Sequence, residues 1–315
     1  MKRRILVWTI AILIVAGIFA VFNPQGLGFK PHIEASAAVL LDMETGGIWV
    51  DVNGDKPMPP ASVSKLMTEM VVMDCISSGK ISWNERVPIS KYASTVGGRK
   101  LSLKSGEFYT VRELFEGIAV YSANDAAVAL AEYTAGSENS FVHMMNNKAR
   151  SLGLSMGTVF ANASGLPMDE LGPNRPAEHA NGETMMIARD AAKLAAALIN
   201  THPEVLNISS RTQMQLKGKG LYVSNSNLML PDMGGAYAYP GNDGLKTGYD
   251  SRIGYCMAGT AQRNGHRLIA VVMGAESNES RFVGAAKLFD YGFYRGLSYN
   301  ERFKHIVHVI GSVMG

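Results

Sequence analysis

A proline-rich loop that runs directly into an apolar helix places the strongest constraint on how this chain folds. Three of the five residues from Lys56 to Pro60 are proline, so this stretch cannot be helical, and a largely apolar run then continues to about Gly79. A helix that starts after Pro60 carries Ser62 and Lys65 on one face, because side chains three residues apart are neighbours on a helix surface. The sequence therefore predicts a polar pair at the start of a mostly apolar helix.

Ser62 and Lys65 form a candidate catalytic pair. A serine hydroxyl alone is a weak nucleophile, but a lysine beside it can act as its base when burial keeps the amine unprotonated. Ser64 is the sequence neighbour of Lys65, yet its side chain points about 100° away around the helix, which favours Ser62. The alternative is that the serine only caps the helix and the lysine lies at the surface.

Two triplets further along the chain strengthen the catalytic interpretation. They are Ser-Ala-Asn at Ser122–Asn124 and Lys-Thr-Gly at Lys246–Gly248. Each triplet alone is equally compatible with a helix cap or a strand end. The order Ser-x-x-Lys, Ser-x-Asn, Lys-Thr-Gly is typical of penicillin-binding proteins and class A β-lactamases, so the three motifs together indicate one catalytic site.

Length and composition are those of a globular enzyme with an added apolar segment. The chain has 315 residues, of which 47% are hydrophobic and 18% charged. A formal net charge of +3, without a basic run interleaved with aromatic residues, gives no reason to expect a nucleic-acid partner. Cys75 and Cys256 lack metal-ligand spacing and lie in apolar runs, so we expect two buried thiols, with a disulfide as the alternative. No metal or cofactor is expected.

The first 30 residues have the pattern of an export segment. Lys2, Arg3 and Arg4 precede an uncharged apolar run from Ile5 to Phe22. This run is long for a cleaved signal peptide and short for a membrane span, so cleavage and an uncleaved anchor both remain open. In either case the basic residues favour an extracytoplasmic location for the rest of the chain, at the outer face of the cytoplasmic membrane or in the cell-wall space.

The predicted element order is that of an α/β (α+β) protein. An early hairpin is followed by helices, and strands with a last helix close the domain. We therefore expect an antiparallel sheet flanked by helices, an all-helical lobe inserted at about residues 80–200, and a site in the cleft between them. We expect the catalytic domain to span residues 31–298. The expected strands are 37–43, 48–52, two near 210–230 and those within 241–274, and the expected helices are 62–79, 111–120, 124–135, 140–152, 184–199 and 280–294.

Acyl transfer through serine requires a nucleophile, a base and a proton route to the leaving amine. Ser62 would supply the nucleophile and Lys65 the base. Ser122 would relay the proton from Lys65 to the departing nitrogen. Asn124 has an amide that can orient Lys65 and bind a peptide carbonyl.

The third motif would hold the substrate. Lys246 would add positive charge beside the cleft, and Thr247 would offer a hydroxyl to a substrate carboxylate. Gly248 would let the ligand backbone lie close to its strand. The backbone N–H groups of Ser62 and Tyr249 would form the oxyanion hole.

From about Ala37 to Phe293 the sequence resembles the D-alanyl-D-alanine carboxypeptidases, the low-molecular-mass penicillin-binding proteins of serine peptidase family S11. The resemblance rests on Pro60–Thr68, Tyr121–Ala126 and Asp243–Tyr249, and is extended by Asn162–Pro167 and Gly254–Cys256. It implies a β-lactamase/transpeptidase-like fold and a metal-free serine peptidase. The implied substrate is the pentapeptide of peptidoglycan, which loses its terminal D-alanine. The resemblance also implies acylation by β-lactam antibiotics, and contact of Arg281 with the substrate carboxylate.

Two departures from the family pattern bear on function. Asp250 stands where the family usually has threonine, and Ile253 where it usually has alanine. An acid at position 250 would weaken or tune substrate binding. In the segment Met168–Asn181, Glu170 lacks the Glu-x-x-Leu-Asn arrangement of class A β-lactamases, so fast β-lactam hydrolysis is not expected.

Three alternatives remain open at this stage. A D,D-endopeptidase or a β-lactamase would use the same scaffold, and Asp250 motivates a catalytically silent peptidoglycan-binding protein. Residues 299–315 have an apolar helical face, which predicts either attachment to the membrane surface or packing against the catalytic domain.

Overall fold

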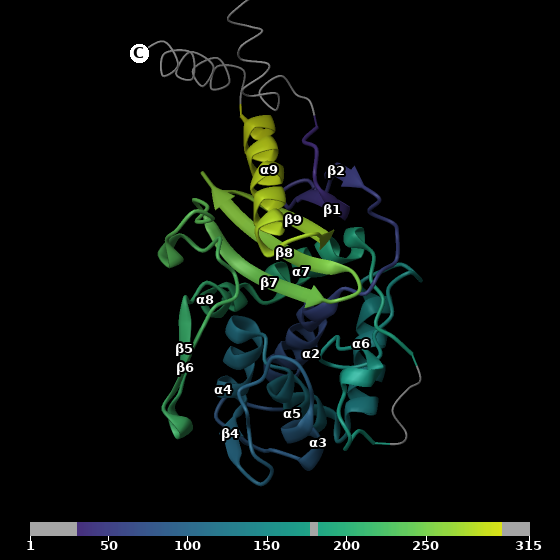
Figure 1. The fold of residues 1–315 in the computed structure, drawn as a ribbon, viewed down its shortest axis with the longest axis vertical. Coiled ribbons are helices and arrows are strands. Elements are labelled where there is room, and N and C mark those ends of the chain that lie inside the picture. The colour runs from purple at the N-terminus through teal and green to yellow at the C-terminus, as the bar shows by residue number, and fades with distance from the viewer. Residues whose placement is uncertain (1–29, 177–181, 298–315) are drawn as a thin grey trace, which may run out of the picture.

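The computed structural model describes residues 30–176 and 182–297 as a sheet with helices on both faces (Figure 1). The predicted export segment before residue 30 and the tail 299–315 lie outside the described residues. The strands are β1 Ala35–Asp42, β2 Ile48–Val52, β3 Arg86–Pro88, β4 Phe108–Thr110, β5 Gln213–Leu216, β6 Leu221–Ser224, β7 Asn242–Asp250, β8 Gly254–Arg263 and β9 His266–Ala275. The helices are α2 Lys65–Ser77, α3 Lys91–Thr95, α4 Val111–Glu116, α5 Asn124–Ala135, α6 Glu138–Ser151, α7 Ala188–Thr201, α8 Leu206–Ser209 and α9 Asn278–Gly296.

Five antiparallel strands form the main sheet, in the order β2-β1-β9-β8-β7. A hairpin turn at Asn264–Gly265 joins β8 to β9, and both of its residues have positive φ, as a tight hairpin turn requires. Strand β7, which carries the Lys-Thr-Gly motif, pairs only with β8 and is therefore an edge strand. The predicted α/β (α+β) class with an antiparallel sheet is confirmed.

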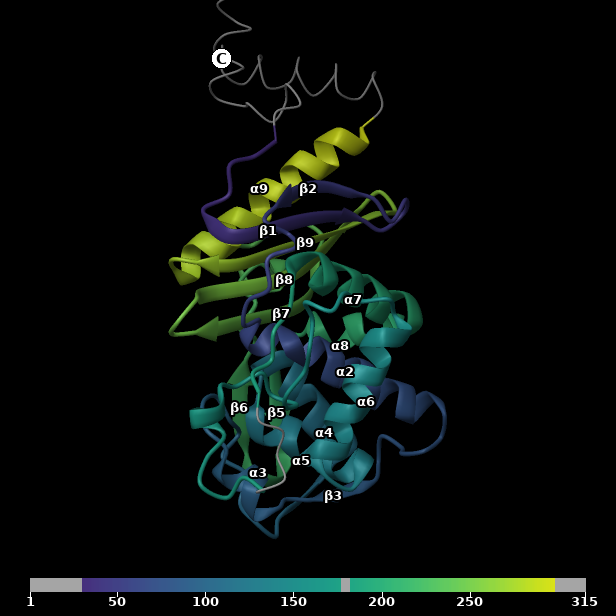
Figure 2. The ribbon, with the colours of Figure 1, turned by 90° about the vertical axis from the view of Figure 1, so that its right-hand side faces the viewer.

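The sheet is buried on both faces, which explains why its central strands are apolar without interruption. Ala37, Val39 and Leu41 of β1 belong to one hydrophobic core, whereas Ala38 and Leu40 belong to another, because successive side chains of a strand point to opposite faces. Figure 2 shows α9 across one face and α7, α8 and α2 below the other. The second core lies between the sheet and α9.

The helical lobe forms around α2. Helices α5 and α6 pack on α2, and α3 and α4 pack on α5, as in the lower half of Figure 1. Helix α7 falls within residues 80–200, the stretch expected to form the inserted lobe, yet it packs against β1 and β9. It also begins at Ala188 rather than 184, because the backbones of Met185 and Met186 instead form bridges to Val159 and Met58.

The segment 80–110, which lies outside the expected strands and helices, contains β3, α3 and β4. Strand β4 pairs with β3, and α3 is capped by the Ser90 side chain, which accepts a hydrogen bond from the Ala93 N–H. These elements are too short for a periodic pattern to reveal them.

Both cysteines are free and buried, as the sequence predicted. Burial raises the pKa of the Cys256 thiol to about 11. None of the helices in the described ranges combines the length and the apolar character needed to cross a bilayer.

Phe289 tests the contribution of the core beneath α9. Its side chain is fully buried against the sheet, whereas that of Val283 on the same helix is 43% exposed. Phe289→Ala should lower the free energy of unfolding by about 3–5 kcal/mol because it leaves a cavity. Val283→Ala should cost less than about 0.5 kcal/mol. Urea denaturation of both variants measures the difference, and equal losses would contradict this account of the second core.

Candidate active site

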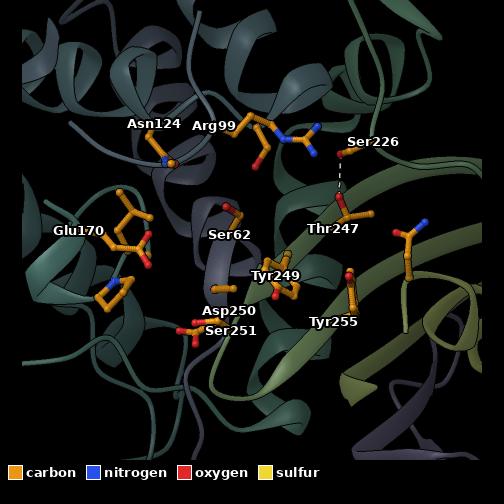
Figure 3. A pocket seen from close by; sticks show the side chains of 18 of the residues that line it. Ser62, Arg99, Asn124, Glu170, Ser226, Thr247, Tyr249, Asp250, Ser251 and Tyr255 are labelled. Atoms are coloured by element: carbon orange, nitrogen blue, oxygen red, sulfur yellow. Dashed lines mark hydrogen bonds between the residues drawn. The ribbon is translucent and has the colours of Figure 1, made fainter. Parts of the chain in front are cut away.

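A cavity of about 490 Å³ lies between the helical lobe and the edge strand β7. Its lining comes from segments that are far apart in sequence, and Figure 3 shows Ser62 in the middle, between Thr247 and Glu170. The three predicted motifs therefore meet at one cavity. The lining residues are Ala61, Ser62, Gly98, Arg99, Ser122, Asn124, Gly165, Leu166, Pro167, Glu170, Ser226, Thr247, Gly248, Tyr249, Asp250, Ser251, Tyr255, Asn278 and Arg281.

The amine of Lys65 is the centre of the hydrogen-bond network. Its Nζ lies 2.8 Å from Ser62 Oγ, 2.6 Å from Asn124 Oδ1 and 2.6 Å from the Ser164 carbonyl oxygen. The oxygens of Asn124 and Ser164 can only accept hydrogen bonds. A neutral amine has two N–H groups for these oxygens, which directs its lone pair at the Ser62 hydroxyl. The predicted pairing of Ser62 with Lys65, and of Asn124 with Lys65, is present.

Burial sets the protonation of Lys65. The side chain is completely buried, and its burial holds the pKa of the amine well below the usual 10.5. The nearby positive charge of Lys246 lowers the pKa further, and Glu69 opposes the shift. The unprotonated form is therefore favoured much more than in an exposed lysine, as a base requires.

Two close approaches hold the nucleophile in place. Ser62 lies in a 3₁₀ turn, Ala61–Ser64, directly before α2. A Cβ on Gly165 would lie 2.3 Å from the Ala61 carbonyl oxygen, and one on Gly248 would lie 3.0 Å from the Ser62 nitrogen. The sequence assigned Gly248 to the approach of a ligand backbone. The structure gives it a further reason, since the turn with Ser62 packs directly against β7.

The motif Asn162–Pro167 builds the turn that supplies the third partner of Lys65. The Asn162 side chain accepts hydrogen bonds from the N–H groups of Ser164 and Gly165 and donates one to the Leu166 carbonyl. This tight turn aims the Ser164 carbonyl at Lys65. The sequence contained the motif but gave no indication of its role, because a backbone carbonyl has no residue-type signature.

Ser122 and Asn124 lie at the junction between two helices. Ser122 has a left-handed conformation, with φ of 67°, and its buried hydroxyl has no hydrogen-bond partner within residues 30–176 and 182–297. The Asn124 amide donates to the Gly97 carbonyl at 2.9 Å and accepts from Lys65 through its oxygen. Ser122 thus brings an unpartnered hydroxyl to the cavity lining, whereas the Asn124 side chain is held by hydrogen bonds to Gly97 and Lys65.

Strand β7 presents the predicted binding residues along one side of the cavity. The Thr247 hydroxyl donates to Ser226 Oγ at 2.6 Å, the interaction drawn as a dashed line in Figure 3. Tyr249 is 58% exposed, and its ring lies 4.6 Å from that of Tyr255. Ser226 was not predicted because it belongs to no recognised motif. Tyr255 lies within the motif Gly254–Cys256, but that motif carried no assigned site residue.

Lys246, which was predicted to add positive charge beside the cleft, lies beneath the cavity. Its side chain is buried and does not line the cavity, and Nζ donates to the Thr247 carbonyl at 3.2 Å. Burial lowers the pKa of Lys246 to about 7 and raises that of the buried Glu69 carboxyl, while the charges of the two groups counteract these shifts. Lys246 therefore influences the site from below the cavity wall, where its charge lowers the pKa of Lys65.

Arg99 adds a solvent-accessible positive charge to the cavity lining. Its guanidinium stacks over the Tyr121 ring at 5.2 Å and points towards Ser226 in Figure 3. The loop is held by Asp125, whose carboxylate accepts hydrogen bonds from the N–H groups of Leu101 and Leu103. Arg99 was missed because the loop has no helical or strand periodicity.

Arg281 lines the cavity but uses its guanidinium to support β7. Nη1 donates to the Gly248 carbonyl at 2.8 Å, and Nη2 donates to Asn278. Burial lowers the pKa of Arg281 to about 10. The resemblance assigned Arg281 to the substrate carboxylate. In the structure, its guanidinium hydrogen-bonds to the backbone of β7.

The charge of Asp250 is compensated within the protein. Both of its carboxylate oxygens accept hydrogen bonds from the Arg252 guanidinium, which also pairs with Glu183. Hydrogen bonds from Arg252 lower the pKa of Asp250, so the carboxyl stays ionised. Asp250 therefore enters the cavity lining as part of an ion-pair cluster and not as a free acid.

Comparison with known proteins gives one consistent result. The family model described as D-alanyl-D-alanine carboxypeptidase, peptidase family S11, matches residues 26–277. The D-alanyl-D-alanine carboxypeptidases DacF of Bacillus subtilis and DacD of Escherichia coli are 34% and 36% identical over 82% and 93% of this chain. The chain spans 62% of the first of these relatives and 72% of the second. Penicillin-binding protein D2 of Listeria monocytogenes, in its ampicillin-bound form, superposes with a TM-score of 0.71 and 34% identity, covering 84% of this chain and 99% of that one.

The two buried lysines can be tested without any substrate. In protein with ¹³C-labelled lysine Cε atoms, NMR titration should show Lys246 changing protonation near pH 7 and Lys65 well below 10.5, because both amines lose solvation on burial. Lys65→Met and Lys246→Met variants assign the two resonances. Midpoints near 10.5 for both amines would show that neither is desolvated as described.

Proposed function

The chain belongs to the D-alanyl-D-alanine carboxypeptidase family of serine peptidases, and from this premise we propose that it removes the terminal D-alanine from peptidoglycan stem peptides through an acyl-enzyme. The observation that carries the proposal is the contact between the buried Lys65 amine and the Ser62 hydroxyl at the cavity. The oxygens of Asn124 and Ser164 accept the two N–H groups of the neutral Lys65 amine, so its lone pair is available to the Ser62 hydroxyl. A base next to a nucleophile in a ligand-sized cavity is the arrangement that acyl transfer needs.

In the proposed acylation, Lys65 accepts the Ser62 proton as the serine oxygen attacks the carbonyl of the penultimate D-alanine. The new C–O bond gives a tetrahedral intermediate with a negative oxygen. The backbone N–H groups of Ser62 and Tyr249 would stabilise that oxygen. This role is supported by the close packing of the Ser62 turn on β7 beside Gly248.

The peptide would bind along β7 as an added strand. An edge strand has unpaired backbone groups that an extended peptide can use, and the last four residues of β7, Thr247–Asp250, line the cavity consecutively. The terminal carboxylate would bind at the Thr247–Ser226 end, where Arg99 points. Gly248 would admit the backbone of the peptide, and Asn124 would bind one of its carbonyl groups.

Proton return completes the cycle. The C–N bond breaks as the proton on Lys65 passes through the Ser122 hydroxyl to the departing amine of D-alanine. The Ser122 hydroxyl, which has no partner in the described residues, would gain one when that amine arrives. Water then attacks the ester with Lys65 again accepting a proton, and Ser62 is released as the free hydroxyl.

The same pathway accounts for β-lactam antibiotics as covalent inhibitors. A β-lactam ring presents an amide carbonyl to Ser62, and ring opening leaves an acyl-enzyme. The similarity to an ampicillin-bound penicillin-binding protein supports this proposal. Fast hydrolysis of the acyl-enzyme is not proposed.

We also propose that the protein is exported and acts at the outer face of the cytoplasmic membrane. The support is the basic start of the chain and the uncharged run from Ile5 to Phe22. The apolar helical face expected within residues 299–315 would add a contact with the membrane surface.

Replacement of the nucleophile gives the direct test. Ser62→Ala should abolish covalent labelling by a fluorescent penicillin and reduce D-alanine release from a pentapeptide by about 10³-fold or more, because no acyl-enzyme forms. Ser64→Ala, two residues further along the chain, should retain labelling. Labelling of Ser62→Ala would refute the assignment. Cleavage of cross-linked muropeptide instead of pentapeptide would indicate an endopeptidase, and rapid turnover of penicillin would indicate a β-lactamase.

The protonation of Lys65 predicts a direction for the pH dependence. Only the neutral amine can accept the Ser62 proton, so the rate of acylation by penicillin should be high above the pKa of Lys65 and fall as pH decreases through it. Because burial lowers this pKa, the plateau should begin well below pH 10.5. Lys65→Arg, which stays protonated, should not acylate measurably at any pH that preserves the fold. A wild-type rate that keeps rising up to pH 10.5 would exclude a desolvated Lys65 as the base.

A further inference from the structure

The two ends of the cavity differ in charge. At the Thr247 end, Arg99 points towards Ser226. At the opposite end in Figure 3, Glu170 and Asp250 line the cavity on the far side of Ser62. A ligand that spans the cavity therefore meets positive charge at one end and carboxylates at the other.

Of these two carboxylates, Glu170 is the one available to a ligand. The charge of Asp250 is taken up by Arg252. Glu170 is exposed to solvent, and the described part of the chain gives its carboxylate no ion-pair partner. A carboxylate in this situation is free to bind a cation of the substrate.

The backbone of Glu170 is fixed although its side chain is exposed. Its carbonyl accepts a hydrogen bond from the Gly97 N–H at 3.0 Å, and its N–H donates to the Pro167 carbonyl at 3.0 Å. A Cβ on Gly97 would lie 2.4 Å from the Glu170 carbonyl oxygen, so the two loops meet without space for a side chain. The carboxylate therefore projects from a defined position on the cavity wall.

The length of β7 indicates which part of the substrate reaches Glu170. A strand rises about 3.3 Å per residue. An extended peptide that runs along β7 from Thr247 to Asp250 therefore spans about 10 Å, or three of its own residues. The two terminal residues occupy Thr247 and the neighbourhood of Ser62. The third residue from the carboxyl end then lies beside Tyr249 and Asp250, on the Glu170 side.

We propose that Glu170 is a specificity-determining residue, which binds a cationic side chain on the third residue from the carboxyl end of the peptide substrate. The inference rests on the proposed peptidase function and adds a substrate preference to it. An ammonium group would form a charge-assisted hydrogen bond with the Glu170 carboxylate. Acylation of that amine would remove both the charge and the preference.

The test compares two synthetic peptides, diacetyl-L-Lys-D-Ala-D-Ala and its analogue in which the lysine ε-amine is free. Wild-type protein should cleave the free amine with a kcat/KM about five- to tenfold higher at low salt, a preference that shrinks as salt screens the contact. Glu170→Gln should reduce the ratio to within about twofold, and Glu170→Lys should invert it by placing like charges together. Both kcat/KM values are measured with one protein preparation, so a smaller folded fraction lowers both equally and leaves their ratio unchanged.

Asp169→Asn is the matched control. Asp169 is the exposed neighbour of Glu170 and does not line the cavity, so this variant should keep the wild-type ratio. A wild-type ratio near one, or a preference that survives in Glu170→Gln, would overturn the inference while leaving the peptidase proposal intact. If wild-type protein released D-alanine from neither peptide, the proposed function itself would fail, and the inference with it.

Discussion

The site depends on keeping one amine uncharged inside the protein. An ammonium group is costly to bury without a counter-ion, and Lys65 is surrounded by neutral oxygens from Ser62, Asn124 and Ser164. These oxygens come from the 3₁₀ turn, the start of α5 and the turn after residue 162. A change in any of these segments alters the solvation or the hydrogen bonds of the same nitrogen. The helical lobe therefore serves mainly to enclose α2 and to bring these oxygens to it.

The sheet contributes the other half of the site by leaving one edge available. Strand β7 is fixed from behind by Arg281 and by its register with β8, while its front faces the cavity. The Ser62 turn approaches this strand so closely that a Cβ at position 248 would lie 3.0 Å from the Ser62 nitrogen. Ser62 and β7 are thus held relative to each other by direct packing, which would fix the geometry for the proposed acyl transfer before a substrate binds.

The sequence predicted those parts of the structure that repeat a pattern or share a motif. The strand and helix order, the sheet type and the convergence of Ser62, Ser122 and Thr247 were all accessible, because periodicity and motif spacing report local structure. The burial of Lys246 next to Lys65 was not predicted, since no residue pattern distinguishes a lysine that lines a cavity from one buried beneath it. Arg99 and the Ser164 carbonyl were missed because loop packing places them. Asp250 looked like a free acid until its neighbour Arg252 was seen to bind it.

The position of β7 also limits which molecules can reach the nucleophile. Its open edge lies inside a crevice, opposite the loops of Arg99 and Glu170, and not on an outer surface of the molecule. A cavity of about 490 Å³ can hold a short extended segment of a peptide. A folded protein would have to place an extended segment in this recess to reach the Ser62 hydroxyl. The recess likewise keeps the edge from pairing with a second molecule and starting a fibril.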